Sequence, residues 1–118
     1  MKNDTIAILD DEFDRLEAMV PILAKRYPQL KVVTFDNAPG INAWFEENLE
    51  SCVLICLDHD LGPNRERDGK VFDPGIGRDV TEFLSTREAV CPIIIHTTNT
   101  IARPGMIFIL EDAGWSVS

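Results

Sequence analysis

Acidic side chains follow two apolar segments of the sequence, at the point where each segment ends. Asp10 and Asp11 come directly after the first segment, and Asp58 and Asp60 follow the second. Four carboxylates in one crevice would repel one another, and some would stay protonated, unless a cation shared the site. Mg²⁺ suits such a site, because it binds carboxylate oxygens and keeps water molecules that a phosphate group can replace. We therefore predict a divalent-metal site on Asp10, Asp11, Asp58 and Asp60; the alternative is that these acids are solvated or cap helices.

The two histidines of the chain, His59 and His96, are the candidate proton carriers. His59 lies between Asp58 and Asp60, and on an extended backbone it would point away from both. It is therefore a metal ligand, a general acid or a partner that fixes a carboxylate. His96 ends a fully apolar segment and is either hydrogen-bonded in the core or directed into the crevice. With a histidine ligand, Mn²⁺ or Zn²⁺ would be alternatives to Mg²⁺. Because two histidines near a phosphate allow acid–base cleavage of a phosphoester, we predict catalytic roles for His59 and His96. Asp58 completes the predicted catalytic residues, as a ligand of the metal that would polarise the phosphoryl group.

Hydrogen-bond donors that suit phosphate lie in two places. One group directly follows His96, and the other belongs to a polar stretch between residues 62 and 77. The predicted phosphate-binding residues are Thr97, Asn99, Arg65, Arg67 and Lys70. Such a long stretch without regular structure is typical of a functional lid or a disordered segment. Its cations would hold phosphate oxygens, or would only balance charge on a solvated loop.

Five apolar segments are predicted to be the strands that position these side chains: residues 5–9, 31–35, 52–57, 92–96 and 115–118. Amphipathic helical patterns separate them, the first from Phe13 to about Tyr27, where Pro21 is expected to kink or split the helix. Regular alternation of strands and helices demands a parallel sheet with helices on both faces. Ligands of such sheets bind beyond the carboxyl ends of the strands, where the candidate residues are expected to meet.

Composition restricts the class of protein. The chain has 118 residues, which fits one domain covering residues 1–118. Its net charge of −9 argues against bulk binding of nucleic acid. Three cysteines without a CxxC pair argue against a disulfide scaffold or zinc ribbon and are expected to be core thiols. No apolar run approaches the ~20 residues that span a membrane, and no signal peptide is visible, so we expect a cytoplasmic protein.

The order and spacing of Asp10-Asp11, Asp58 and Thr97 resemble the receiver domain of bacterial response regulators. This resemblance implies a flavodoxin-like α/β fold, with a five-stranded parallel sheet in the order 2-1-3-4-5. It also implies that the acidic pair binds metal and that Asp58 accepts a phosphoryl group. The lysine that normally ends the fifth strand of receivers has no counterpart before Ser118.

A second resemblance accounts for the departures from ordinary receivers. The run Leu57-Asp-His-Asp-Leu-Gly62, the pair His96 and Asn99, and Ala113-Gly114-Trp115 are similar to the cyclic-phosphate-processing receiver family. It implies a site that processes or senses phosphate esters such as cyclic phosphates, with a small phosphate ester or a phosphate terminus as the ligand. The alternative is a signalling receiver that is phosphorylated on Asp58 and regulates a partner protein.

Overall fold

Four parallel strands form the central sheet of the computed structural model, which describes residues 3–67 and 69–118. In the order in which they lie, the strands are β2 (Lys31–Phe35), β1 (Thr5–Leu9), β3 (Cys52–Leu57) and β6 (Ile93–Ile95). All residues of β1 are buried, as expected for a central strand covered on both faces. The predicted flavodoxin-like α/β fold is confirmed, including the first four positions of the strand order.

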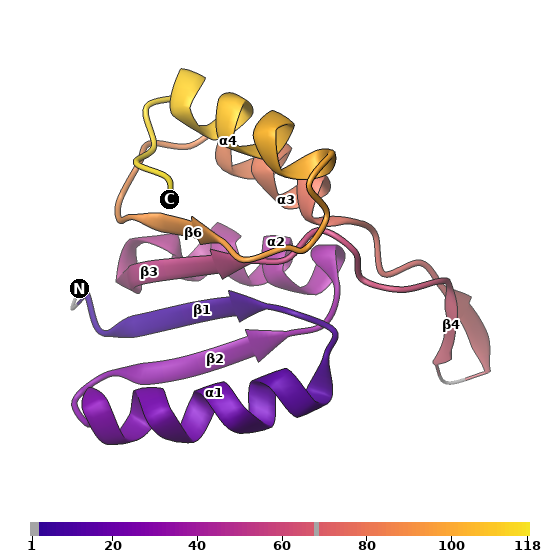
Figure 1. Cartoon of the computed structure of the whole chain (residues 1–118), viewed down its shortest axis with the longest axis horizontal. Helices are drawn as coiled ribbons and strands as arrows, with labels where there is room; N and C mark the ends of the chain where they lie inside the picture. Colours follow the sequence, from indigo (N-terminus) through magenta and orange to yellow (C-terminus); the bar gives the residue numbers. More distant parts are fainter. Residues whose placement is uncertain (1–2, 68) are drawn as a thin grey trace.

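Helices cover both faces of the sheet (Figure 1). They are α1 (Phe13–Arg26), α2 (Ala38–Asn48), α3 (Gly77–Leu84) and α4 (Ala102–Asp112), with a short 3₁₀ helix η1 (Leu49–Ser51) before β3. Ile6 and Ile8 pack with Leu16 of α1 on one face. Ala7 and Leu9 belong to the core that α2, α3 and α4 share on the other. This separation follows from the two-residue period of β1, which sends alternate side chains to opposite faces.

The helix α1 is continuous through Pro21, so the predicted split of this helix is wrong. Pro21 and Glu17, the residue whose carbonyl loses its hydrogen bond to the proline, are both exposed. Leu16 and Leu23 pack on the sheet from either side of the proline and hold the helix in place.

The predicted fifth strand is reduced to a single parallel bridge between Val117 and Ile93. The segment still lies at the edge of β6, because the Ile93 N–H donates to the Ser116 carbonyl at 2.9 Å. The N–H of Trp115 instead donates to the Leu110 carbonyl at 3.0 Å, in the turn that ends α4. Pairing with β6 therefore begins only at Ser116. Among the described residues, the parallel sheet has four strands rather than the predicted five.

The stretch from residue 62 to 77, expected to lack regular structure, contains an antiparallel hairpin. Its strands are β4 (Arg65–Arg67) and β5 (Lys70–Phe72), and a bridge between Asp60 and Ile76 closes its base. This hairpin arm projects away from the sheet at the carboxyl end of the strands (Figure 1). Paired backbone groups explain how so long an insertion is ordered outside the core.

Burial raises the pKa of the Cys52 thiol to about 12 and that of Cys56 to about 11. Both side chains therefore stay protonated at neutral pH and behave as the small apolar core groups that the sequence predicts. Among the described residues, no helix is long and apolar enough to span a membrane.

Candidate metal and phosphate site

Three of the four predicted metal ligands meet at the carboxyl edge of the sheet. Asp10, Asp11 and Asp58 each offer a carboxylate oxygen, and these atoms lie within 4.8 Å of one another. The reason is the register of β1 and β3, in which Leu9 pairs with Leu57, so both strands end at the same level. We call Asp10, Asp11 and Asp58 the acidic cluster.

The acidic cluster is buried to different degrees. Asp10 is completely buried, Asp58 is 6% exposed, and Asp11 is half-buried. Burial raises the pKa of Asp11, and the charge of Asp58 raises it further, with smaller effects of Glu12 and Asp10. Hard carboxylate oxygens that carry surplus negative charge are the donors that Mg²⁺ prefers, so these residues fit a divalent cation.

Arg15 is the cation that partly neutralises the acidic cluster. Its Nη1 lies 3.1 Å from Asp10 Oδ2 and 4.0 Å from Asp58 Oδ2. Arg15 is not among the residues predicted from the sequence, because a lone arginine on an amphipathic helix is usually solvated. One feature of the sequence could have found it: Arg15 lies in the first turn of a helix, where the helix dipole disfavours a cation.

His96 is directed at the acidic cluster. Its Nε2 lies 3.1 Å from Asp10 Oδ2, and since a carboxylate can only accept, the Nε2–H donates. The other ring nitrogen, Nδ1, is buried and has no hydrogen-bond partner among the described residues. His96 thus lies at the carboxyl edge of the sheet and is hydrogen-bonded to the fully buried Asp10.

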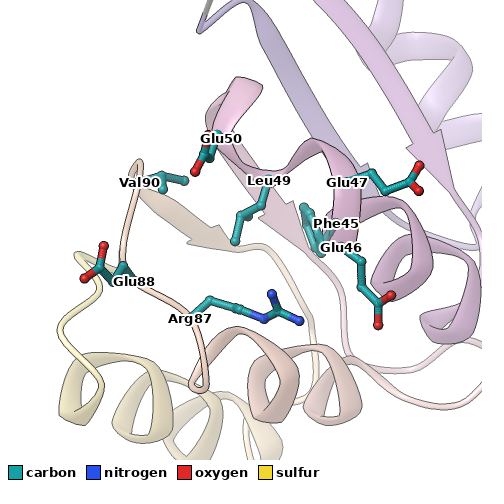
Figure 2. Close-up of a pocket in the computed structure, with 8 residues that line it drawn as sticks. All are labelled: Phe45, Glu46, Glu47, Leu49, Glu50, Arg87, Glu88 and Val90. Atoms are coloured by element: carbon teal, nitrogen blue, oxygen red, sulfur yellow. The ribbon is translucent and has the colours of Figure 1, made fainter. Parts of the chain in front are cut away.

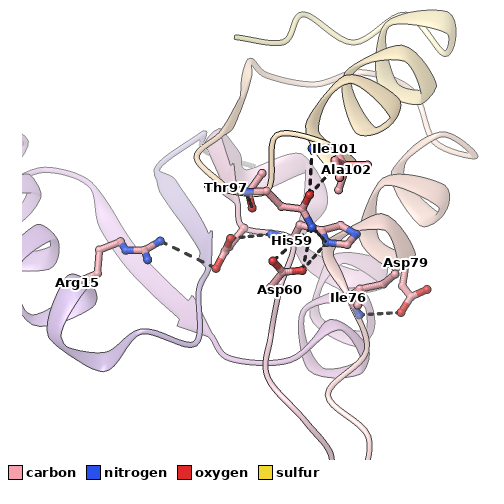
Figure 3. A network of polar contacts seen from close by, with 10 residues as sticks. Arg15, His59, Asp60, Ile76, Asp79, Thr97, Ile101 and Ala102 are labelled. Atoms are coloured by element: carbon pink, nitrogen blue, oxygen red, sulfur yellow. Dashed lines mark hydrogen bonds and ion pairs between the residues drawn. The ribbon is translucent and has the colours of Figure 1, made fainter.

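Asp60 lies outside the acidic cluster, although the sequence predicted it as the fourth ligand. Its exposed carboxylate accepts from His59 Nδ1 at 2.9 Å, and the chain turns away from the sheet here to pair with Ile76. Asn99 Nδ2 donates to Asp60 Oδ1 at 3.3 Å (Figure 3). These two hydrogen bonds, that of His59 first, keep the pKa of Asp60 below its usual value. Asp60 therefore orients the His59 ring by accepting the hydrogen bond from its Nδ1.

Asn99 is predicted to bind phosphate, and both its side-chain oxygen and its side-chain nitrogen are hydrogen-bonded within the protein. Its Oδ1 accepts from the N–H groups of Ile101 and Ala102 at the start of α4, at 3.1 and 2.9 Å (Figure 3). The backbone N–H of Asn99 donates to the Thr97 hydroxyl at 3.1 Å. The structure thus brings Thr97 and Asn99 to the predicted edge, where Asn99 links α4 to the pair of His59 and Asp60.

The predicted phosphate-binding cations lie on the hairpin arm. Arg65 is held at the carboxyl end of β2, where its two terminal nitrogens donate to Asp36 Oδ2 at 3.1 Å and to the Asp36 carbonyl at 2.7 Å. Lys70 is exposed. The side chain of Arg67 lies outside the described part of the structure. Arg65 therefore tethers the arm.

The chain matches the family model of the cyclic-phosphate processing receiver domain over residues 6–112. It belongs to this family. No curated protein matches the chain.

Solved receiver domains share the fold of this family member. A phosphorylated cyanobacterial phytochrome response regulator, RcpA, is similar with a TM-score of 0.70 at 17% identity, over 98% of this chain and 78% of that one. A response regulator receiver protein from Pseudomonas putida has a TM-score of 0.67 at 16% identity, over 99% and 84% of the two chains. The beryllofluoride-activated NtrC receiver domain has a TM-score of 0.59 at 16% identity, over 99% and 82%. At such identities the likeness shows the fold.

A cavity of about 420 Å³ lies near the opposite edge of the sheet in this receiver domain (Figure 2). It lies beside the segments that lead into β3 and β6. Its lining residues are Phe45, Glu46, Glu47, Leu49, Glu50, Arg87, Glu88 and Val90. Four glutamates against one arginine would repel a phosphate ester, and none of the predicted site residues reaches it. The acidic cluster is therefore the better candidate site.

Proposed function

We propose that this receiver domain binds a divalent cation, Mg²⁺ above all, on Asp10, Asp11 and Asp58 and there processes or senses a phosphate ester such as a cyclic phosphate. The observation that carries the proposal is the convergence of these three carboxylates within 4.8 Å, with a surplus of negative charge. Membership of the cyclic-phosphate processing receiver family supports the class of ligand.

The two histidines support acid–base chemistry in different ways. His59 donates a hydrogen bond from Nδ1 to Asp60, which leaves its Nε2 to accept or donate a proton at the ligand. His96 donates to Asp10 and keeps that buried carboxylate oriented. A bound divalent cation would supply polarisation of a phosphoryl oxygen and a water molecule of lowered pKa.

The remaining predicted groups would recognise the phosphate. The Thr97 hydroxyl stands at the end of β6, and Lys70 lies on the hairpin arm that leaves the same edge of the sheet. We place Arg65 in a supporting role, because Asp36 already engages its guanidinium.

The test is an activity and binding assay with the whole chain. Cyclic mononucleotides, 2′,3′-cyclic phosphates and phosphomonoesters would be offered with Mg²⁺, Mn²⁺ and Zn²⁺. We expect metal-dependent turnover or binding that Asp58→Asn and His59→Gln abolish. Asp112→Asn, an exposed carboxylate at the end of α4, should retain the wild-type behaviour. No turnover and no metal-dependent binding across the panel would refute the proposal.

A second candidate function is that of a phosphorylated receiver that regulates a partner protein. Asp58 favours it, because it ends the central strand β3 inside the acidic cluster, where a cation would offset the charge of a phosphoryl group. Structurally similar receivers include one described as phosphorylated and one as beryllofluoride-activated. Acetyl phosphate with Mg²⁺ should then add one phosphoryl group by mass spectrometry, and Asp58→Asn should prevent it.

A further inference from the structure

Arg15 contacts the same carboxylates that we propose as metal ligands. Its Nη1 lies 3.1 Å from Asp10 Oδ2 and 4.0 Å from Asp58 Oδ2. The Asp10 side chain is fully buried, whereas that of Arg15 is 38% exposed. One nitrogen atom of the Arg15 guanidinium therefore contacts two of the three acids of the cluster.

The position of Arg15 is explained by these acids and not by its helix. A buried carboxylate without a partner is costly, and among the described side chains Arg15 and His96 form ion pairs with Asp10 Oδ2. The first turn of α1 disfavours a cation, because the helix N-terminus carries partial positive charge. The carboxylates must therefore supply the attraction that holds the guanidinium there.

We propose that Arg15 is an exchangeable counter-ion, which neutralises Asp10 and Asp58 in the metal-free domain and which a divalent cation displaces. This inference rests on the metal site of the proposed function. A guanidinium and a divalent cation on the same oxygens repel each other strongly at such distances. Because more than a third of the Arg15 side chain is exposed, its guanidinium can leave the acids for water without refolding of α1.

The competing interpretation is a permanent ion pair that orients Asp10. The two interpretations predict opposite changes in metal affinity when Arg15 is removed. An exchangeable counter-ion lowers metal affinity, so its removal strengthens metal binding. A permanent positioning residue raises metal affinity, so its removal weakens binding.

The experiment titrates the whole chain with Mg²⁺ or Mn²⁺ alone, by calorimetry, without any phosphate ester. We expect Arg15→Gln to bind metal about tenfold more tightly, which corresponds to about 1.4 kcal/mol. Arg15→Lys keeps the charge and should stay near the wild-type affinity. Arg26→Gln removes a charge from the last turn of the same helix and should also change little.

A second readout separates displacement from simple repulsion and needs no variant. In nitrogen NMR spectra, the guanidinium protons of Arg15 should exchange slowly without metal and rapidly at saturating Mg²⁺. Equal or weaker metal binding by Arg15→Gln, or slow exchange that persists at saturation, would overturn the inference. If the wild type binds metal but Arg15→Gln binds it no better, only the role of Arg15 fails. If no variant binds metal, the proposed metal site fails and this inference with it.

Discussion

The carboxyl edge of the sheet holds two groups of polar side chains whose carboxylates differ in burial. The inner group consists of Asp10, Asp58 and His96, which follow the strands β1, β3 and β6: His96 donates to Asp10, and Arg15 contacts both carboxylates. The outer group consists of His59, Asp60 and Asn99, with the hairpin arm beside it. Asp10 and Asp58 are buried, so a lost partner is costly there, whereas water can replace a lost partner of the exposed Asp60. The two histidines do not follow this difference, because the side chain of His59 is 12% exposed and that of His96 is 17% exposed.

The largest effect is expected at Gly77, where the inner group is packed against α3. A Cβ on Gly77 would overlap the Asp58 carbonyl and lie 2.8 Å from the His59 Cα. Since both are backbone atoms, we expect Gly77→Ala to lower the free energy of unfolding by about 3 kcal/mol. Gly105→Ala, where the nearest atom is 4.0 Å away, should be neutral or stabilising in its helix. Urea denaturation measures both, and equal effects would contradict this account.

The next prediction compares a buried with an exposed carboxylate. Asp10→Asn removes a buried charge that Arg15 and His96 contact, and we expect a loss of about 2 kcal/mol in metal-free buffer. Asp60→Asn removes an exposed one, for which about 0.5 kcal/mol is expected. Denaturation with EDTA present gives both values. If Asp60→Asn proves the more harmful, the distinction between the inner and outer groups is wrong.

The pH dependence of Asp11→Asn sharpens the comparison further. The folded pKa of Asp11 is raised, so its ionisation destabilises the folded state as the pH rises through that pKa. Without metal, Asp11→Asn should therefore melt higher than the wild type at pH 7. The difference should vanish below the unfolded pKa of about 3.8, where both states bind the proton. Thermal melts across this range are the measurement, and a difference independent of pH would argue against charge as its cause.

The smallest effect on stability is expected for the tether of the hairpin arm. Arg65→Gln loses the hydrogen bonds to Asp36, yet the partly exposed pair should contribute less than about 1 kcal/mol to unfolding. Hydrogen exchange of β4 and β5 should nevertheless become faster, because Arg65 joins the arm to the residue that follows β2. Lys70→Gln is the matched control and should leave exchange unchanged. Unchanged exchange in Arg65→Gln would mean that other contacts hold the arm.

Much of the inner group could be predicted from local pattern. Short apolar segments that are followed by Asp10 and Asp58 predict buried parallel strands, and the carboxyl ends of such strands meet at one edge. The two-residue period of β1 also determines which side chains face α1. These features depend on short-range alternation of apolar and polar residues, which a sequence displays directly.

Only the tertiary structure decided which partners these side chains take. Arg15 of α1 contacts Asp10 after β1, and Asp60 contacts His59 where its backbone pairs with Ile76. The hairpin arm has strands of three residues with mixed polarity, too short for a recognisable period. Contacts between residues far apart in sequence depend on register and helix placement, which no local pattern encodes. The sequence by itself therefore determined where the acids gather, and the three-dimensional packing decided which cation and which histidine each one holds.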